Sequence, residues 1–214
     1  MIKFSVDMRT ALSPVRDQRT RSTCMAFAAS DGHALAHARP MSDLSTEYAH
    51  FFACRRMPSF EPHQGTSGVA MLDAIRLDGQ PLEAEWPYLK TLPSDLASYK
   101  PPSTLTDIFR RVGEELKTLD EADAALEAGL PVIMGVGLSR TFYQLRDDSI
   151  LLADPDLLVA GRHAVLGVGR YLSPEGYGYL VRNSWGSRWG AGGYGLISRA
   201  YLEPRILFLG VFRG

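Results

Sequence analysis

Four side chains, far apart along the chain, form a set that could carry out nucleophilic chemistry on an amide. In chain order they are Gln18, Cys24, His163 and Asn183. A thiolate attacks carbonyl carbon, an imidazole exchanges the thiol proton, and a carboxamide can hold that imidazole in one orientation. The Gln18 amide and the backbone N–H of Cys24 could donate to the negative charge that forms on the attacked oxygen. The set predicts a thiol hydrolase that needs neither a metal ion nor an organic cofactor.

The local sequence gives each of these residues a suitable element. A Ser-Thr pair immediately before Cys24 can cap a helix, and the positive end of that helix favours a thiolate. His163 begins a β-type run, and Asn183 begins an Asn-Ser-Trp-Gly turn. In that turn Trp185 could cover the histidine–asparagine hydrogen bond and strengthen it by excluding water.

The apolar residues have helical spacing in the first half of the chain and β-type spacing in the second half. Helices are expected from about Cys24, after the cap Ser45, and over 69–77 and 120–128, with Pro40 ending the first one. Residues 80–104 are rich in proline and are expected to be irregular. Short β-type runs punctuated by glycine follow. The order predicts an α+β protein with two unlike lobes. The runs cover 132–136, 163–168, 177–182 and 193–197.

The composition is ordinary for a globular protein and excludes several partner classes. The chain has 214 residues, 45% of them hydrophobic, which suits one domain or two small lobes. A formal net charge of −1 gives no sign of nucleic acid or an anionic membrane as a partner. The apolar runs are too short to cross a bilayer, and the first residues lack the apolar core of a secretory signal.

The two cysteines indicate the redox environment. Pairing Cys24 with Cys54 would remove the nucleophile, so we expect no disulfide and interpret Cys54 as a buried structural thiol. The absence of a disulfide framework favours a reducing compartment. We therefore expect the protein to act in the cytoplasm, or to be exported into the cytosol of another cell by a route that uses no signal peptide.

These residues and the motifs around them resemble the papain family of cysteine peptidases. The resemblance runs from Val6 to about Ile197, and the Asn-Ser-Trp-Gly turn with the Trp-Gly and Gly-Tyr-Gly that follow it is its most specific part. The matching segments are 14–18, 44–47, 86–88, 183–186, 189–190 and 193–195.

The resemblance implies a role for each of the four residues. Cys24 matches the nucleophile and His163 the general base. Asn183 matches the residue that orients the imidazole, and Gln18 the oxyanion donor. It also implies a single papain-like catalytic domain over 1–214. In that domain a helical lobe, approximately 10–105, faces a β-barrel-like lobe, 106–214 plus the N-terminal segment, with the active site in the cleft between them.

Three more residues are expected on the substrate side of the site. Gly65 resembles the glycine whose backbone pairs with an extended peptide, which is a form of β-strand addition. Gly135 is expected to line a pocket under the second residue on the acyl side of the cleaved bond. Trp185 is expected beside the histidine. The implied partner is a peptide or protein substrate.

Several positions depart from the family pattern. Arg21 stands where the family usually has a cysteine, so a disulfide position is vacant, as in bleomycin-hydrolase-like and some bacterial members. Arg19 replaces a glycine after the oxyanion glutamine, and Met25 replaces the tryptophan after the nucleophile. We expect no inhibitory pro-segment before the catalytic residues, and therefore expect restraint from a protein inhibitor or regulator, from export or from narrow specificity.

The sequence leaves three functions open. The first is a peptidase, an endopeptidase by default, that acts through a Cys24 thioester. The second is an acyl transferase or peptide ligase that passes the same thioester to an amine. The third is a degenerate papain-like module that binds a peptide without cleaving it. The physiological substrate, the pocket preference and the oligomeric state are not indicated.

Overall fold

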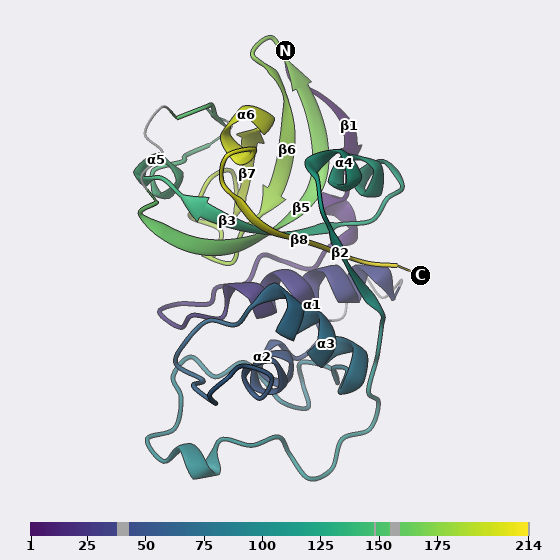
Figure 1. Cartoon of the computed structure of the whole chain (residues 1–214), viewed down its shortest axis with the longest axis vertical. Coiled ribbons are helices and arrows are strands. Elements are labelled where there is room, and N and C mark those ends of the chain that lie inside the picture. Colours follow the sequence, from purple (N-terminus) through teal and green to yellow (C-terminus); the bar gives the residue numbers. More distant parts are fainter. Residues whose placement is uncertain (38–42, 148, 155–158, 214) are drawn as a thin grey trace.

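Three helices in one half of the molecule pack beneath a curved sheet in the other half (Figure 1). The computed structural model describes residues 1–37, 43–147, 149–154 and 159–213. The first half of the chain supplies the helices, and the second half supplies most of the strands. This confirms the predicted α+β architecture with two unlike lobes. The main helices are α1 (Cys24–Ala36), α2 (Thr46–Cys54) and α3 (Gly68–Leu77).

Two of these helices begin with the serine caps that their sequences favour. The Ser45 Oγ accepts a hydrogen bond from the backbone N–H of Tyr48 at 3.1 Å, which satisfies one of the free donors in the first turn of α2. The Ser67 Oγ does the same for α3 by accepting from the Ala70 N–H at 3.1 Å. Pro40, expected to end the first helix, lies outside the described residues.

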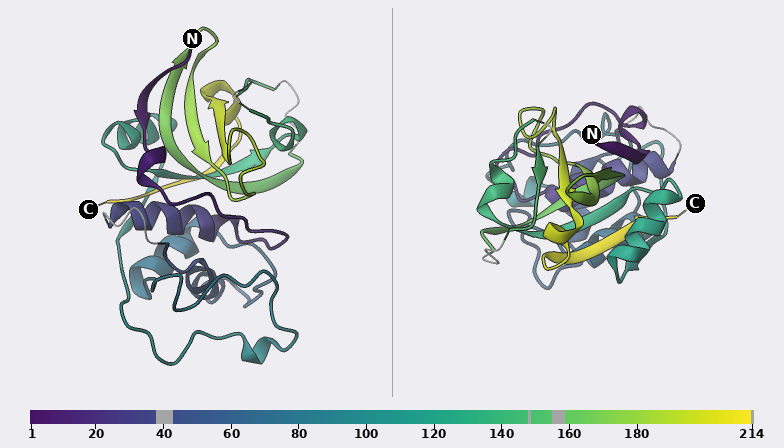
Figure 2. Two further views of the ribbon diagram at one scale, coloured as in Figure 1. Left: turned by 180° about the vertical axis from the view of Figure 1, so that it is seen from behind. Right: turned by 90° about the horizontal axis from the view of Figure 1, so that it is seen from above.

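The strands form one sheet in the order β2-β8-β3-β5-β6-β7-β4, with β1 added on β5. Neighbours are antiparallel except for β4 and β7. Figure 2 shows β1 lying along the sheet near the N-terminus. The strands are β1 (Lys3–Asp7), β2 (Gly113–Leu116), β3 (Val132–Leu138), β4 (Ile150–Leu151), β5 (Gly161–Ser173), β6 (Gly176–Arg182), β7 (Tyr194–Ser198) and β8 (Ile206–Phe212).

The long strand β5 explains why this sheet curves strongly. Its first half, Gly161–Gly167, pairs with β3, and its second half, from Leu166 onward, pairs with β6. A register shift between Gly167 and Gly169 accompanies the change of partner. Among the described strands the sheet stays open, with β2 at one end and β4 at the other. The barrel-like lobe expected from the sequence is therefore a curved open sheet.

Short helices and irregular chain complete the two lobes. The sheet carries α4 (Leu119–Glu127), α5 (Arg140–Tyr143) and α6 (Arg199–Leu202), and the 3₁₀ turn η1 (Arg9–Ala11) follows β1. The proline-rich stretch 80–104 holds only the 3₁₀ turn η2 (Leu96–Ser98), as predicted. The lobe boundary near residue 105 stays a prediction. In the described part of the chain, no helix is both long and apolar enough to cross a membrane.

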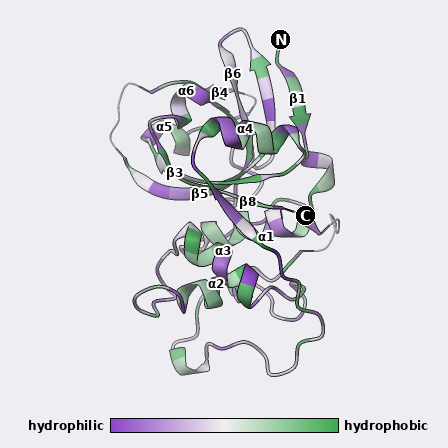
Figure 3. Cartoon of the chain, turned by 45° about the vertical axis from the view of Figure 1, so that its right-hand side comes forward, coloured by the Kyte–Doolittle hydropathy of each residue, from purple (hydrophilic) through white to green (hydrophobic). Residues whose placement is uncertain are grey.

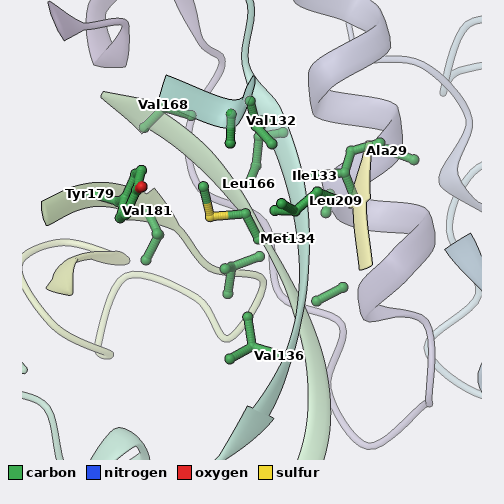
Figure 4. Packing of buried hydrophobic residues seen from close by; sticks show 14 of the residues in the cluster. Ala29, Val132, Ile133, Met134, Val136, Leu166, Val168, Tyr179, Val181 and Leu209 are labelled. Carbon is green, nitrogen blue, oxygen red and sulfur yellow. The ribbon is translucent and has the colours of Figure 1, made fainter. Parts of the chain in front are cut away.

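The core lies where α1 meets the sheet, with α2 on the far side of α1 (Figure 3), while α3 also contacts β2 and β8. Small residues of α1, such as Ala26 and Ala29, are fully buried and allow this helix to approach the strands closely. Figure 4 shows Ala29 beside Ile133 and Leu209, with Met134 filling the space on the other side of β3. The nucleophile-bearing helix is thus fixed against the sheet along its length.

A buried ion network also joins the helix to the sheet. The Asp31 carboxylate on α1 accepts from Arg16 Nη2 at 2.6 Å and from Arg182 Nε, at the end of β6, at 2.7 Å. The same Arg182 donates to the carbonyl oxygen of Ser13 at 2.7 Å. Because Arg182 precedes Asn183 in the chain, the network also fixes the start of the Asn-Ser-Trp-Gly turn.

Candidate active site

Cys24 is the first residue of α1, and its thiol is free and partly buried. Thr23 occupies the N-cap position, as predicted, but its side chain makes no capping hydrogen bond. Its Oγ1 lies 2.9 Å from the hydroxyl oxygen of Tyr88 instead. The N–H groups of the first helical turn therefore remain available to an anion beside Cys24.

His163 and Asn183 lie in direct contact, and the geometry fixes the tautomer of the imidazole. The Nε2 atom of His163 is 2.7 Å from Asn183 Oδ1, and the backbone N–H of Ser184 donates to the same oxygen at 2.8 Å. A backbone N–H can only donate, so the Asn183 atom is the carbonyl oxygen. His163 Nε2 must then carry the hydrogen, which leaves Nδ1 as a proton acceptor.

The sulfur of Cys24 lies against the strand that carries this imidazole. The backbone N–H groups of Ala164, the residue after His163, and of Met25 and Cys24 lie close enough to the sulfur to affect its ionisation. Burial raises the pKa of the Cys24 thiol, and these three donors act in the opposite direction. The start of α1 with Cys24 thus lies close to the segment of β5 that carries His163.

Burial disfavours a charge on the Cys24 thiol alone or on the His163 imidazole alone. Burial lowers the pKa of His163 to about 4, although the hydrogen bond that His163 donates to Asn183 favours the charged form. A lone thiolate or a lone imidazolium is therefore unfavourable here. Transfer of the thiol proton to His163 creates both charges together, and their attraction offsets the loss of solvation.

Aromatic rings pack against the imidazole of His163. The Trp185 ring centroid is 4.4 Å from that of His163, which is the covering position expected for this residue. Tyr143 stacks on Trp185 at 5.3 Å, and Phe142 meets it edge-on at 5.7 Å. Phe142 and Tyr143, both in α5, were not predicted from the sequence as part of the site. Their only signal is an aromatic pair shortly after the buried strand β3.

The Gln18 side chain is buried and held at both ends. Its Nε2 donates to the carbonyl oxygen of Arg21 at 2.7 Å, and its Oε1 accepts from the Ser184 hydroxyl at 2.7 Å. The bond to Ser184 brings Gln18 to the turn that begins with Asn183. Since an amide nitrogen carries two hydrogens, Gln18 keeps one donor for another acceptor.

Gly65 lies beside the segment that leads to the nucleophile. It is exposed, and a Cβ atom added there would lie 3.6 Å from the carbonyl oxygen of Ser22, two residues before Cys24. The Gly65 backbone is therefore close to the site and open to solvent. This arrangement leaves room for an extended chain to approach it.

Gly135 is buried beside Phe208 of β8, and its place in a substrate pocket stays a prediction. A Cβ atom added to Gly135 would lie 3.1 Å from Phe208 and 3.8 Å from the Met25 side chain. Cβ atoms added to Gly68 and Gly210 would lie 2.4 Å and 2.8 Å from the same ring. Three glycines thus accommodate one phenylalanine, and nothing in the local sequence of Phe208 indicates this.

The model of the family described as papain family cysteine protease matches residues 2–204 of this chain. The chain belongs to the papain family. Cysteine proteinases 3 and 2 of Entamoeba histolytica are 28% and 30% identical to it, over 91% and 89% of its length. The chain spans 62% of the length of each of these two relatives.

Solved structures show the same papain-like fold. Xylellain, a cysteine protease from Xylella fastidiosa, superposes with a TM-score of 0.76 at 18% identity, over 97% of this chain and 85% of xylellain. The Carica candamarcensis cysteine protease CMS1MS2, solved in complex with E-64, gives a TM-score of 0.74 at 23% identity and 97% coverage of both chains. The papain-like fold expected from the motifs is confirmed.

Proposed function

We propose that the chain is a cysteine peptidase that cleaves peptide bonds through a thioester on Cys24. The observation that carries the proposal is the hydrogen bond from His163 Nε2 to an Asn183 oxygen that Ser184 identifies as an acceptor. It leaves Nδ1 of the imidazole to take the proton of a thiol that lies against the same strand. Trp185 shields this hydrogen bond from water.

The proposed reaction has two halves. The Cys24 sulfur attacks the peptide carbonyl carbon while its proton moves to His163, and the carbonyl oxygen becomes an anion. The free Nε2 hydrogen of Gln18 and the backbone N–H of Cys24 donate to this oxygen. The C–N bond then breaks as His163 gives its proton to the amine, which leaves a thioester. Water, deprotonated by His163, attacks the thioester and releases the acid and the Cys24 thiol.

We infer that the substrate is an extended peptide or protein segment. The exposed Gly65 backbone beside Ser22 supports pairing with an extended chain, in which main-chain hydrogen bonds supply affinity. The Phe208 side chain, with its Cβ beside Gly135 and its ring against Gly68 and Gly210, supports a preference for a small side chain on the acyl side. We propose endopeptidase action in a reducing compartment such as the cytosol, in line with the two free thiols.

A peptide-library cleavage profile with Cys24→Ala as the control tests the proposal. The wild-type protein should cleave internal bonds, and the products should be free acids when an amine is added in excess. Cys24→Ala should fold normally and cleave nothing. Products joined to the added amine would instead favour an acyl transferase. Peptide binding without cleavage or thioester formation would favour a binding module.

A further inference from the structure

The loop from Gln18 to Thr23 carries the side-chain donor of the proposed oxyanion hole and leads directly into Cys24. The orientation of the Gln18 amide depends on this loop, because its Nε2 donates to the Arg21 carbonyl oxygen at 2.7 Å. The Arg21 N–H lies 3.4 Å from the Gln18 carbonyl oxygen and the Thr23 N–H lies 2.9 Å from that of Arg21. A movement of the Arg21 carbonyl therefore reaches the Gln18 amide directly, whereas α1 stays fixed by its packing against the sheet.

The Arg21 side chain is fixed by a two-pronged ion pair inside the helical lobe. Its Nη1 and Nη2 donate to the two carboxylate oxygens of Glu47, on α2, at 2.7 and 2.9 Å. Nη1 also donates to the carbonyl oxygen of Leu89 at 2.6 Å. The side chains of Arg21 and Glu47 are only 8% and 0% exposed. A planar guanidinium bonded in this way has one orientation.

Glu47 is itself held by neighbours other than Arg21. The Tyr99 hydroxyl donates to its Oε1 at 2.5 Å, and the Leu89 N–H donates to its Oε2 at 2.9 Å. With the two bonds from Arg21, the carboxylate receives four donors, which is about its full capacity. The Arg21 partner is thus a rigid anchor on α2.

The loop needs such an anchor because its backbone is strained. Arg19, between Gln18 and Arg21, has a φ of +56°, in the left-handed region that non-glycine residues seldom adopt. A conformation of this kind persists only when the surrounding structure enforces it. Tyr88 holds the loop at the Gln18 carbonyl and at Thr23, and Arg21 holds the part between them.

We propose that Arg21 is a positioning residue: its ion pair with Glu47 aims the Gln18 amide at the oxyanion. The ion pair fixes this loop to α2, in place of the disulfide for which the loop has no cysteine. The inference rests on the proposed peptidase function. It predicts that Arg21 affects the step in which negative charge develops on oxygen, and leaves the reactivity of the Cys24 thiolate unchanged.

The experiment compares Arg21→Met and Arg21→Lys with wild type in three assays. Peptide turnover and inhibition by a peptide aldehyde both require a stabilised oxyanion, whereas alkylation of Cys24 by iodoacetamide requires only the thiolate. Arg21→Met should lower kcat and weaken the aldehyde ~10-fold or more, with KM and the alkylation rate within about 2- to 3-fold of wild type. Arg21→Lys should recover part of kcat, because its ammonium group keeps the positive charge beside Glu47 but cannot make the bidentate pair of hydrogen bonds.

Two internal controls separate positioning from loss of structure. Cys54 is 1% exposed, so its alkylation in the same mass spectra reports unfolding. Arg76→Met removes an exposed ion pair to Asp73 on α3 and should change none of the readouts. If Arg21→Met unfolds, the Arg21→Lys protein supplies the test.

A double-mutant cycle tests the route through Gln18. In a Gln18→Ala background, Arg21→Met should lower kcat by less than about 3-fold more. The inference is wrong if the two substitutions lower kcat independently, so that their fold-losses multiply. It is also wrong if alkylation of Cys24 falls as much as turnover, or if kcat is unchanged in both Arg21 variants. If wild type neither hydrolyses peptides nor binds the aldehyde, the proposed function fails first, which is a distinguishable result.

Discussion

At the scale of single residues, the site depends on which atom carries a proton. The Ser184 N–H identifies the Asn183 oxygen, and that oxygen places the imidazole hydrogen on Nε2. Burial opposes a charge on His163 or on Cys24 alone. The reactive form of the site is therefore a property of the pair.

Removing the imidazole should shift the reactivity of Cys24 to alkaline pH. In His163→Ala the thiolate loses its counter-charge while burial still raises its pKa, so the thiol should titrate above the ordinary value of ~8.5. Iodoacetamide alkylation at pH 6.5 should fall ~10-fold or more and rise about tenfold per pH unit up to that pKa. Asn183→Ala keeps the imidazole and should show a smaller loss. An unchanged pH profile in His163→Ala would show that the pair does not share the proton.

Truncating Phe208 should change which peptides are cleaved. In Phe208→Ala the space among Gly68, Gly135 and Gly210 becomes open next to Met25, the residue after the nucleophile. Peptides with a large apolar residue on the acyl side should gain at least ~10-fold in kcat/KM, and peptides with a small one should gain little. Leu207→Ala, at the adjacent exposed position of β8, is the matched control. Equal effects of both changes on the cleavage profile would argue against a role for the ring.

The types and order of Gln18, Cys24, His163 and Asn183 predicted a joint site because each has a separate chemical task, and the structure joins His163 to Asn183 and Gln18 to Ser184. Phe208 and the partners of Arg21 were not predictable in this way. Their importance comes from contacts between segments far apart in the sequence, and no local pattern of residues records such contacts.

At the scale of elements, local signals predicted the helices best. The expected helix over 69–77 is α3 (Gly68–Leu77), and that over 120–128 is α4 (Leu119–Glu127). Strands without a clear pattern were missed. β2 is short and polar because it pairs only with β8 at the edge of the sheet, and β8 itself is an apolar run without strict alternation. β1, in the N-terminal segment, was not among the expected β-type runs.

The glycine turn after Asn183 offers a test at this scale. Gly190 has a φ of +55°, and a Cβ atom added there would lie 2.1 Å from the carbonyl oxygen of Tyr194. Gly192 has a similar φ of +66°, with nothing within 4 Å of an added Cβ. Gly192→Ala should cost about 1–2 kcal/mol of unfolding free energy, and Gly190→Ala should cost about 3 kcal/mol or more. Denaturant unfolding measures both, and equal costs would contradict the packing described for this turn.

At the scale of the whole molecule, the buried network around Asp31 joins the two halves of the chain. Asp31 and Arg182 lie 151 positions apart, so no sequence window could reveal their contact. The two-lobe architecture was predictable from the switch in spacing along the chain. The way the lobes are joined was not, because an isolated arginine or aspartate usually indicates a solvated surface.

Asp31→Asn should destabilise the whole molecule. Burial alone would raise the pKa of Asp31, but Arg16 and Arg182 hold it below its ordinary value, so the carboxylate contributes fully at pH 7 and is lost only below about pH 4. The variant removes the counter-charge of the buried Arg182 guanidinium, whereas Arg16 keeps Asp43 and Glu83 nearby, and the expected cost is about 3–5 kcal/mol. The control Asp73→Asn removes an exposed pair with Arg76 and should cost less than about 1 kcal/mol. Urea unfolding at pH 7 compares the two, and similar costs would contradict a stabilising role for the network.

The most direct test of the proposed chemistry is to trap the acyl-enzyme. The protein is mixed with a good peptide substrate, quenched in acid within one turnover and analysed by mass spectrometry of the peptide that contains Cys24. We predict a mass increase equal to the acyl part of the substrate on Cys24 in the wild-type protein, and more of it when deacylation is slowed. Turnover that continues in Cys24→Ala, or in wild type without any adduct on this sulfur, would contradict the account.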